Sequence, residues 1–167
     1  MHELKIVRER REGYGKSTKY SSAASVYLAF QPHFDRLDRE QFVVILLDAK
    51  NIHIGFNVVS VGSLTSSVVH PREVLKPVVL HNDAVQEQYN TKDMAKDICT
   101  MIVRRSAAAI ILAHNHPSGD PCPSAEDLHI TKRLREIGEL MGVRVLDHII
   151  FGDNRYVSFV DDGYWDK

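Results

Sequence analysis

Short runs of apolar residues mark the strands that this sequence predicts. Five such runs stand out, at residues 41–47, 52–61, 107–113, 143–151 and 156–160. Turn-forming residues join the first two runs, and Gly152-Asp-Asn-Arg joins the last two, so both pairs predict antiparallel hairpins. The run at 107–113 belongs to the most apolar stretch of the chain and predicts a central strand.

Two segments predict helices, one before the first strand and one between the third and fourth strands. Ser21 or Ser22 can cap a helix that continues to about residue 34. Residues 124–141 predict a second helix, with Gly142 just past its end as a stop. One stripe of this helix carries its apolar residues: Ile130, Leu134, Ile137 and Met141.

The segment between residues 70 and 106 has a less regular pattern. Pro71 stands at an early helical position, where its missing N–H costs nothing, and Pro77 is expected to end or kink that helix within two turns. Asn90 or Thr91 can cap a further helix that reaches residue 105. Helices and strands in this order predict an α/β or α+β domain around a mixed sheet.

Composition and charge narrow the class of protein. The chain has 167 residues, of which 44% are hydrophobic and 26% charged, as in one globular domain with one core. The 21 basic and 22 acidic side chains nearly cancel, so the net charge does not attract the protein to nucleic acid or to an anionic membrane. No apolar run approaches a membrane span and no signal-like segment opens the chain, so a cytoplasmic protein without a membrane partner is expected.

Two histidines directly follow the most apolar strand. His114 and His116 lie two residues apart, and Pro117 favours an extended backbone at His116. Side chains two apart in a strand point the same way, so both imidazoles can converge on one ion while Asn115 faces elsewhere. Neutral imidazole nitrogens are good zinc ligands. His148 is expected to support such a site by a hydrogen bond.

Asp127, in the first turn of the next helix, is the expected third ligand. The loop between His116 and this helix is rich in Pro and Gly and can fold that turn back over the end of the strand. Two imidazoles and one carboxylate leave a fourth zinc position open, which is typical of a catalytic site. The alternative needs no metal, because Ser124 and Asp127 also match a helix capping box.

These residues resemble a known motif. His114-x-His116, followed by Asp127 with Ser124 three residues before it, is similar to the JAMM motif of the JAB/MPN metallopeptidases. The string His114-Asn-His-Pro-Ser-Gly-Asp-Pro121 and the segment Leu146-Asp-His-Ile-Ile150 resemble the RadC branch. The resemblance implies an α/β, MPN/JAB-type mixed sheet flanked by helices, in a single domain. It also implies a Zn²⁺-dependent hydrolase acting on peptide or isopeptide-linked protein substrates.

The irregular pattern of the first 20 residues and the extent of the resemblance together set the expected boundaries. We expect a poorly ordered arm at residues 1–20, the RadC-like domain at 21–162 and a tail at 163–167. Within the domain, the region around 81–106 is longer than the usual single helix of the family and is expected to be a helical insertion. The sequence does not predict an oligomeric state.

The family mechanism requires a glutamate as general base and a serine near the scissile carbonyl. By resemblance, Glu40 is the expected base because it stands immediately before the first strand, and Glu73 stays as the alternative. Ser124 matches the motif serine that helps to polarise the carbonyl and stabilise its oxyanion. A second function stays open, a DNA-repair-associated RadC-type module that binds DNA or a protein partner without hydrolysis, although the near-neutral charge weighs against DNA binding.

Overall fold

A five-stranded mixed sheet forms the centre of the fold. The computed structural model describes residues 18–62, 69–89 and 106–166. The strands lie in the order β2-β1-β3-β4-β5, and β3 and β4 are parallel whereas the other neighbours are antiparallel. Their bounds are β1 Gln41–Leu47, β2 His53–Val61, β3 Ala109–Asn115, β4 Arg144–Gly152 and β5 Arg155–Ser158. The α/β class, the central β3 strand and both predicted hairpins are therefore confirmed.

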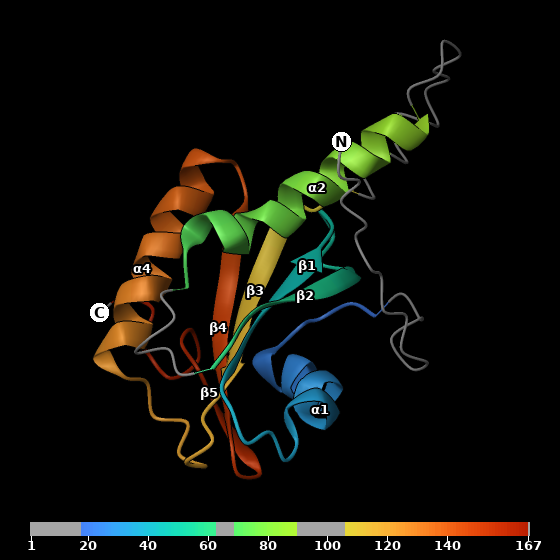
Figure 1. The fold of residues 1–167 in the computed structure, drawn as a ribbon. Coiled ribbons are helices and arrows are strands. Elements are labelled where there is room, and N and C mark those ends of the chain that lie inside the picture. The colour runs from blue at the N-terminus through green and yellow to red at the C-terminus, as the bar shows by residue number, and fades with distance from the viewer. Residues whose placement is uncertain (1–17, 63–68, 90–105, 167) are drawn as a thin grey trace.

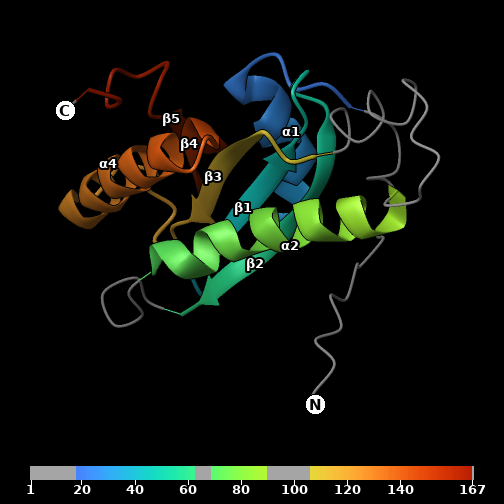
Figure 2. The ribbon, with the colours of Figure 1, turned by 90° about the horizontal axis from the view of Figure 1, so that it is seen from above.

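Helices cover both faces of this sheet. Helix α1 (Ala23–Phe34) packs on one face, whereas α2 (Pro71–Tyr89) and α4 (Ala125–Leu140) pack on the other (Figures 1 and 2). Alternate residues of β1 enter the two cores, with Val43 and Ile45 on the α1 side and Phe42 and Val44 on the other. Because both faces are covered, β1 and β3 read as continuous apolar runs.

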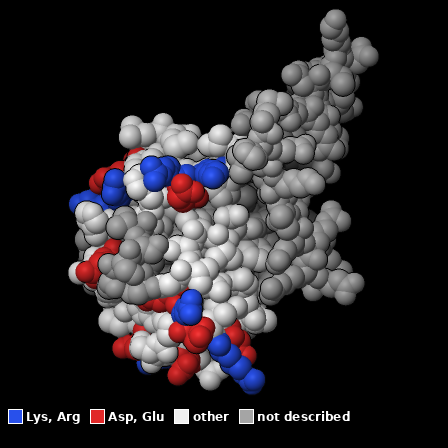
Figure 3. All heavy atoms as spheres, viewed as in Figure 1, with Lys and Arg blue, Asp and Glu red and all other residues white. Residues whose placement is uncertain are grey.

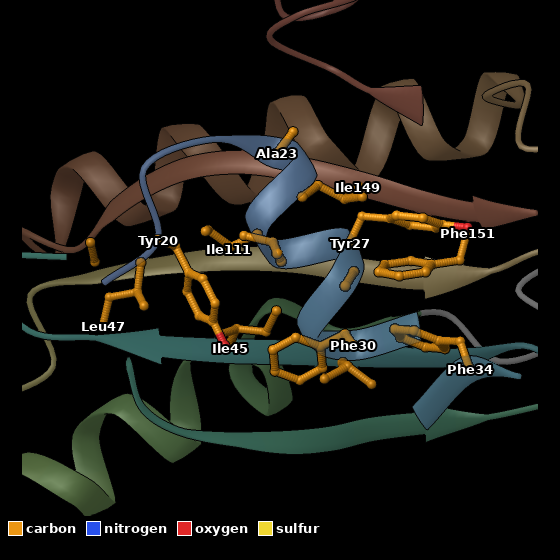
Figure 4. Close-up of a cluster of buried hydrophobic side chains, with 14 residues drawn as sticks. Tyr20, Ala23, Tyr27, Phe30, Phe34, Ile45, Leu47, Ile111, Ile149 and Phe151 are labelled. Atoms are coloured by element: carbon orange, nitrogen blue, oxygen red, sulfur yellow. The ribbon is translucent and has the colours of Figure 1, made fainter. Parts of the chain in front are cut away.

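Aromatic side chains join α1 to the sheet. Tyr27 stacks between Phe151 and Tyr156, with ring centroids 5.3 Å and 4.6 Å away, and Figure 4 shows how its ring lies against Phe151. Tyr20 belongs to the same core and is only 6% exposed. The end of the expected arm therefore contributes to the core, because Lys19 pairs with Ile52 beside β2. Residues 1–17 lie outside the described residues.

Helix α2 is longer than the sequence predicted. The helix runs through Pro77 to Tyr89, so the expectation of a short helix that ends at Pro77 is wrong, whereas the alternative of a kink there stays a prediction. Val74, Leu75 and Val78 are all buried on its inner face. Burying each of these side chains stabilises the fold by about 1.5–3 kcal/mol. Together they offset the roughly 3 kcal/mol that a proline inside a helix costs. The helix expected at 90–105 lies outside the described residues.

The crossover from β3 to β4 contains the predicted site. A loop of residues 116–124 leaves the end of β3, α4 crosses the sheet, and β4 returns parallel to β3. This connection brings the first turn of α4 to the carboxyl end of β3, where ligand sites of parallel strands are usual. None of the helices in the described ranges has the length and apolar character needed to cross a membrane.

Candidate metal centre

Three predicted ligands meet at the end of β3. One ligand atom each of His114, His116 and Asp127 lies within 4.8 Å of the others. The Nε2 atoms of the two imidazoles are 3.0 Å apart, and they lie 3.2 Å and 3.5 Å from the two carboxylate oxygens of Asp127. His114 and Asp127 are fully buried, while His116 is partly exposed. The structure therefore forms a candidate metal site that is open on the His116 side.

Strand pairing explains why the two imidazoles face the same way. The His116 N–H donates to the Phe151 carbonyl at 2.9 Å, so the β3–β4 pairing continues one residue beyond the strand. His114 and His116 consequently share one face of the sheet. The Phe42 ring lies nearly parallel to the His114 ring, with centroids 5.8 Å apart, and packs against the imidazole.

The loop after His116 is fixed to the β4–β5 turn. Gly119 has a φ of 80°, a conformation that favours glycine, and a side chain there would collide with Asp153. The Gly119 carbonyl accepts from the Asp153 N–H at 2.9 Å. Asp120 forms an ion pair of 3.3 Å with Arg155. These contacts turn the chain so that α4 begins directly above the end of β3.

Ser124 combines two tasks at the start of α4. Its hydroxyl accepts from the Asp127 N–H at 3.1 Å, and Asp127 Oδ2 accepts from the Ser124 N–H at 2.8 Å. The predicted capping box is thus present. The same hydroxyl also donates to Asp127 Oδ2 at 2.7 Å. The cap and the metal site are therefore not exclusive, since capping orients the carboxylate toward the imidazoles.

A hydrogen-bond chain determines which nitrogen of His114 faces the site. The Thr131 hydroxyl donates to the Asp127 carbonyl at 2.6 Å, so it can only accept from His148 Nδ1, also at 2.6 Å. Burial lowers the pKa of His148 well below its ordinary value, which keeps that ring neutral. His148 Nε2 is then an acceptor, and the His114 Nδ1–H donates to it at 2.8 Å. His114 therefore carries a hydrogen on Nδ1 and directs its Nε2 toward Asp127.

His116 is oriented by a backbone group. Its Nδ1 lies 2.7 Å from the Asp120 carbonyl, which can only accept, so Nδ1 carries the hydrogen and Nε2 turns to the site. Burial alone would lower the pKa of His116, but Asp127, the Asp120 carbonyl and the charge of Glu40 raise it. The negative charge that favours a proton on Nε2 also favours a metal cation there.

The chemistry of these donors fits a divalent cation. Burial alone would raise the pKa of the Asp127 carboxyl, but the two imidazoles and Ser124 hold that pKa well below its usual range. Asp127 Oδ1 is buried and has no hydrogen-bond partner among the described residues. A proton can bridge only two of the converging atoms, whereas one metal ion can contact all of them. Two imidazoles and a carboxylate form a donor set that zinc accepts.

The two candidate bases occupy different surroundings. Glu40 immediately precedes β1, is half-buried, and lies close enough to His116 for its charge to raise the pKa of that imidazole. Glu73 is exposed in the first turn of α2 and forms ion pairs with Arg72 at 3.4 Å and Lys76 at 3.8 Å. The geometry favours Glu40 over Glu73, and the catalytic roles of Glu40 and Ser124 stay predictions.

Comparison with known proteins shows which family the chain belongs to. The sequence matches the family described as RadC-like JAB domain over residues 20–86 and 89–164, which include all three candidate ligands. This chain belongs to that family. The resemblance to the RadC branch of the JAB/MPN proteins is therefore confirmed.

Curated relatives of this RadC-like chain come from diverse organisms. The UPF0758 protein of Syntrophotalea carbinolica is 45% identical over 166 residues, which are 96% of this chain and 63% of that protein. The UPF0758 protein of Geobacter sulfurreducens is 46% identical over 147 residues, which are 88% of this chain and 54% of the relative. The UPF0758 protein of Staphylococcus haemolyticus is 41% identical over 153 residues, which are 92% of this chain and 57% of that protein. The chain thus spans somewhat more than half of these relatives, whose names state no activity.

Two residues of the centre were not found from the sequence. Thr131 supports His148, as described above, and Asn115 hydrogen-bonds to the backbone on both sides of Glu40. Threonine inside a helix and asparagine between two ligands carry no signal of their own. Thr131 lies four residues after Asp127 on the same helix, and that spacing is the clue that could have identified it.

Proposed function

We propose that this RadC-like JAB domain is a zinc-dependent hydrolase of peptide or isopeptide bonds. One observation carries the proposal, namely that two oriented imidazoles and a buried carboxylate converge at a strand end with one side of the site open. A closed structural zinc site has four protein ligands. The described residues supply three, which supports a site that admits a substrate.

The chain's own residues would hold the metal. His114 and His116 would bind zinc through Nε2, and Asp127 through its carboxylate. When bound there, zinc supplies Lewis acidity, which polarises a carbonyl and lowers the pKa of water. His148 and the Asp120 carbonyl keep the two imidazoles in the tautomer that binding needs.

Glu40 is the proposed general base. Its position beside His116 would let its carboxylate take a proton from water and return that proton to the leaving amine. Ser124 is exposed at the N-terminus of α4, and its hydroxyl is proposed to stabilise the carbonyl oxygen as negative charge develops. The proposed substrate is therefore a polypeptide with an accessible amide bond, or a protein joined through a lysine isopeptide.

The charge distribution gives less support to a DNA-binding role. Figure 3 shows acidic and basic side chains interspersed among the described residues of the face in view. The net charge of the chain is −1, so long-range attraction to phosphate is weak. We therefore prefer hydrolysis to a DNA-associated accessory role.

Metal analysis combined with three variants tests the proposal. Purified protein loaded with zinc and then desalted is expected to retain one zinc per chain and to cleave a mixture of internally quenched peptides or an isopeptide-linked lysine peptide. Glu40→Gln is expected to lower kcat by about 100-fold or more with zinc retained, whereas His114→Ala loses both zinc and activity. His129→Ala is the matched control, because His129 is exposed on α4 and should affect neither. Unchanged turnover in Glu40→Gln would remove Glu40 from the mechanism, and hydrolysis that survives zinc removal would overturn the proposal.

A further inference from the structure

Asn115 lies between the two imidazole ligands but faces away from them. It is the last residue of β3 and only 4% exposed. Its side-chain oxygen accepts from the Gln41 N–H at 2.8 Å, and its side-chain nitrogen donates to the Arg39 carbonyl at 3.1 Å. These two backbone groups flank Glu40. The Asn115 amide therefore holds the chain immediately before and after the proposed base.

Strand register explains why an amide side chain is needed at this place. The β1–β3 pairing ends with Phe42 opposite His114. The same register would set Glu40 opposite His116, but backbone pairing stops before that point. The two Asn115 hydrogen bonds take the place of the missing backbone pairs.

The other side of Glu40 is fixed as well. The Glu40 carbonyl accepts from the Gly62 N–H at 2.9 Å, directly after the end of β2. Glu40 is thus held by β3 through Asn115 and by the β2 side through Gly62. A backbone held from both sides fixes where the Glu40 side chain leaves the chain, and its carboxylate lies near enough to His116 for its charge to act on that imidazole.

We propose that Asn115 is a positioning residue for Glu40, acting through these two hydrogen bonds and without contact to the substrate. The inference rests on the proposed function, in which Glu40 moves the proton. A general base must lie within roughly 2.6–3.2 Å of the group that it deprotonates, and a displacement of about 1 Å can cost about 100-fold in rate. Loss of the clamp should therefore slow turnover while metal binding is preserved.

A double-mutant cycle tests this inference on the zinc-loaded protein. With the internally quenched peptide mixture as probe, Asn115→Ala is expected to lower kcat by about 10- to 100-fold, with less change in KM and full zinc content. In the Glu40→Gln background, the same substitution is expected to cause no further loss. A merely structural role would instead lower kcat by the same factor in both backgrounds.

Asn82 offers a matched control. Its side chain makes the same kind of clamp on Ala107, accepting from the Ala107 N–H at 2.8 Å and donating to the Ala107 carbonyl at 3.4 Å. This clamp lies before β3 begins, at the opposite end from the metal centre. Asn82→Ala is expected to leave kcat within about twofold of the unsubstituted protein, since it does not touch the segment of Glu40.

The outcomes separate this inference from the proposed function. Full turnover in Asn115→Ala with strongly reduced turnover in Glu40→Gln would overturn the role of Asn115 alone. Full turnover in Glu40→Gln would overturn both. Amide hydrogen exchange gives a readout that needs no substrate, because the Gln41 N–H should exchange at least tenfold faster in Asn115→Ala than in Asn82→Ala. Equal exchange of Gln41 in the two variants would overturn the clamp even if the probe is not cleaved.

Discussion

Thr131 and His148 determine which nitrogen of His114 faces the candidate metal site. The hydrogen bonds from the Asp127 carbonyl through Thr131 and His148 occupy His114 Nδ1, so a metal could reach only its Nε2. Partners of this kind usually change metal affinity by 10- to 100-fold when they are removed. The three candidate ligands are therefore only part of the centre, and the helix that supplies Asp127 also supplies the group that orients His148.

Replacing Thr131 tests this dependence. Thr131→Val keeps the side-chain volume but leaves the buried His148 Nδ1–H without an acceptor, which costs about 1–3 kcal/mol of unfolding free energy. Zinc affinity is expected to fall by about tenfold, measured by competition with a chromophoric chelator. Thr131→Ser, which keeps the hydroxyl, should bind zinc like the unsubstituted protein. Equal affinities in all three proteins would show that the hydrogen-bond chain does not orient His114.

Ser124 can be compared with a serine that only caps a helix. Ser22 forms the same type of capping box at the start of α1, which packs on the opposite face of the sheet from α4. Ser124→Ala and Ser22→Ala should each lower the unfolding free energy by about 1 kcal/mol in urea titrations. Only Ser124→Ala should also lower kcat, by about 10- to 100-fold, because only that hydroxyl bonds to Asp127 Oδ2 beside the proposed zinc site. Equal kcat values in the two variants would limit Ser124 to capping.

The sequence was informative about residues whose partners are local. The alternation of His114 and His116 along a strand and the spacing of Ser124 and Asp127 in a helical turn follow from local geometry. The role of Asn115 depends instead on Gln41, which is 74 residues away in the sequence. Such a contact follows from the register of β1 against β3, and register cannot be read from two apolar runs that are buried on both faces.

Elements show the same division between local and distant information. Both hairpins were predictable because turn residues lie between their strands. Helix α4 was predictable because its N-terminal cap, its apolar stripe and the glycine after its end all indicate the same helix. Helix α2 was not predictable in its length. Its continuation past Pro77 depends on the burial of Val74 and Val78 against the sheet, and this tertiary packing outweighs the local preference.

Pro77 should therefore cost α2 stability that alanine would restore. Pro77→Ala supplies an N–H whose helical acceptor is the Glu73 carbonyl, and the unfolding free energy is expected to rise by about 1–3 kcal/mol. Urea unfolding of the zinc-free protein measures this change. Pro71→Ala is the control, because Pro71 is the first residue of α2 and its N–H would have no helical acceptor. An equal rise in both variants would show that the missing N–H of Pro77 is not what costs α2 stability.

At the scale of the whole molecule, the candidate centre joins parts that are distant in sequence. Glu40 precedes β1, and the two imidazoles lie at the carboxyl end of β3. Asp127 lies in the first turn of α4, and His148 lies in the middle of β4. The order of the strands places these elements side by side. A metal that binds only when all of them are assembled must stabilise the folded state relative to the unfolded chain.

Zinc should therefore raise the stability of the entire domain. At a free zinc concentration of 100 times Kd, the unfolding free energy is expected to increase by about 2.7 kcal/mol, which thermal or urea unfolding can measure. His114→Ala should abolish this increase, whereas Glu40→Gln should retain it, because Glu40 is not a proposed ligand. The increase should also become smaller as the pH falls, since the pKa of His116 is raised and a protonated imidazole cannot bind metal. An equal increase in His114→Ala would place the bound zinc elsewhere on the chain and leave the convergence at the end of β3 without a metal.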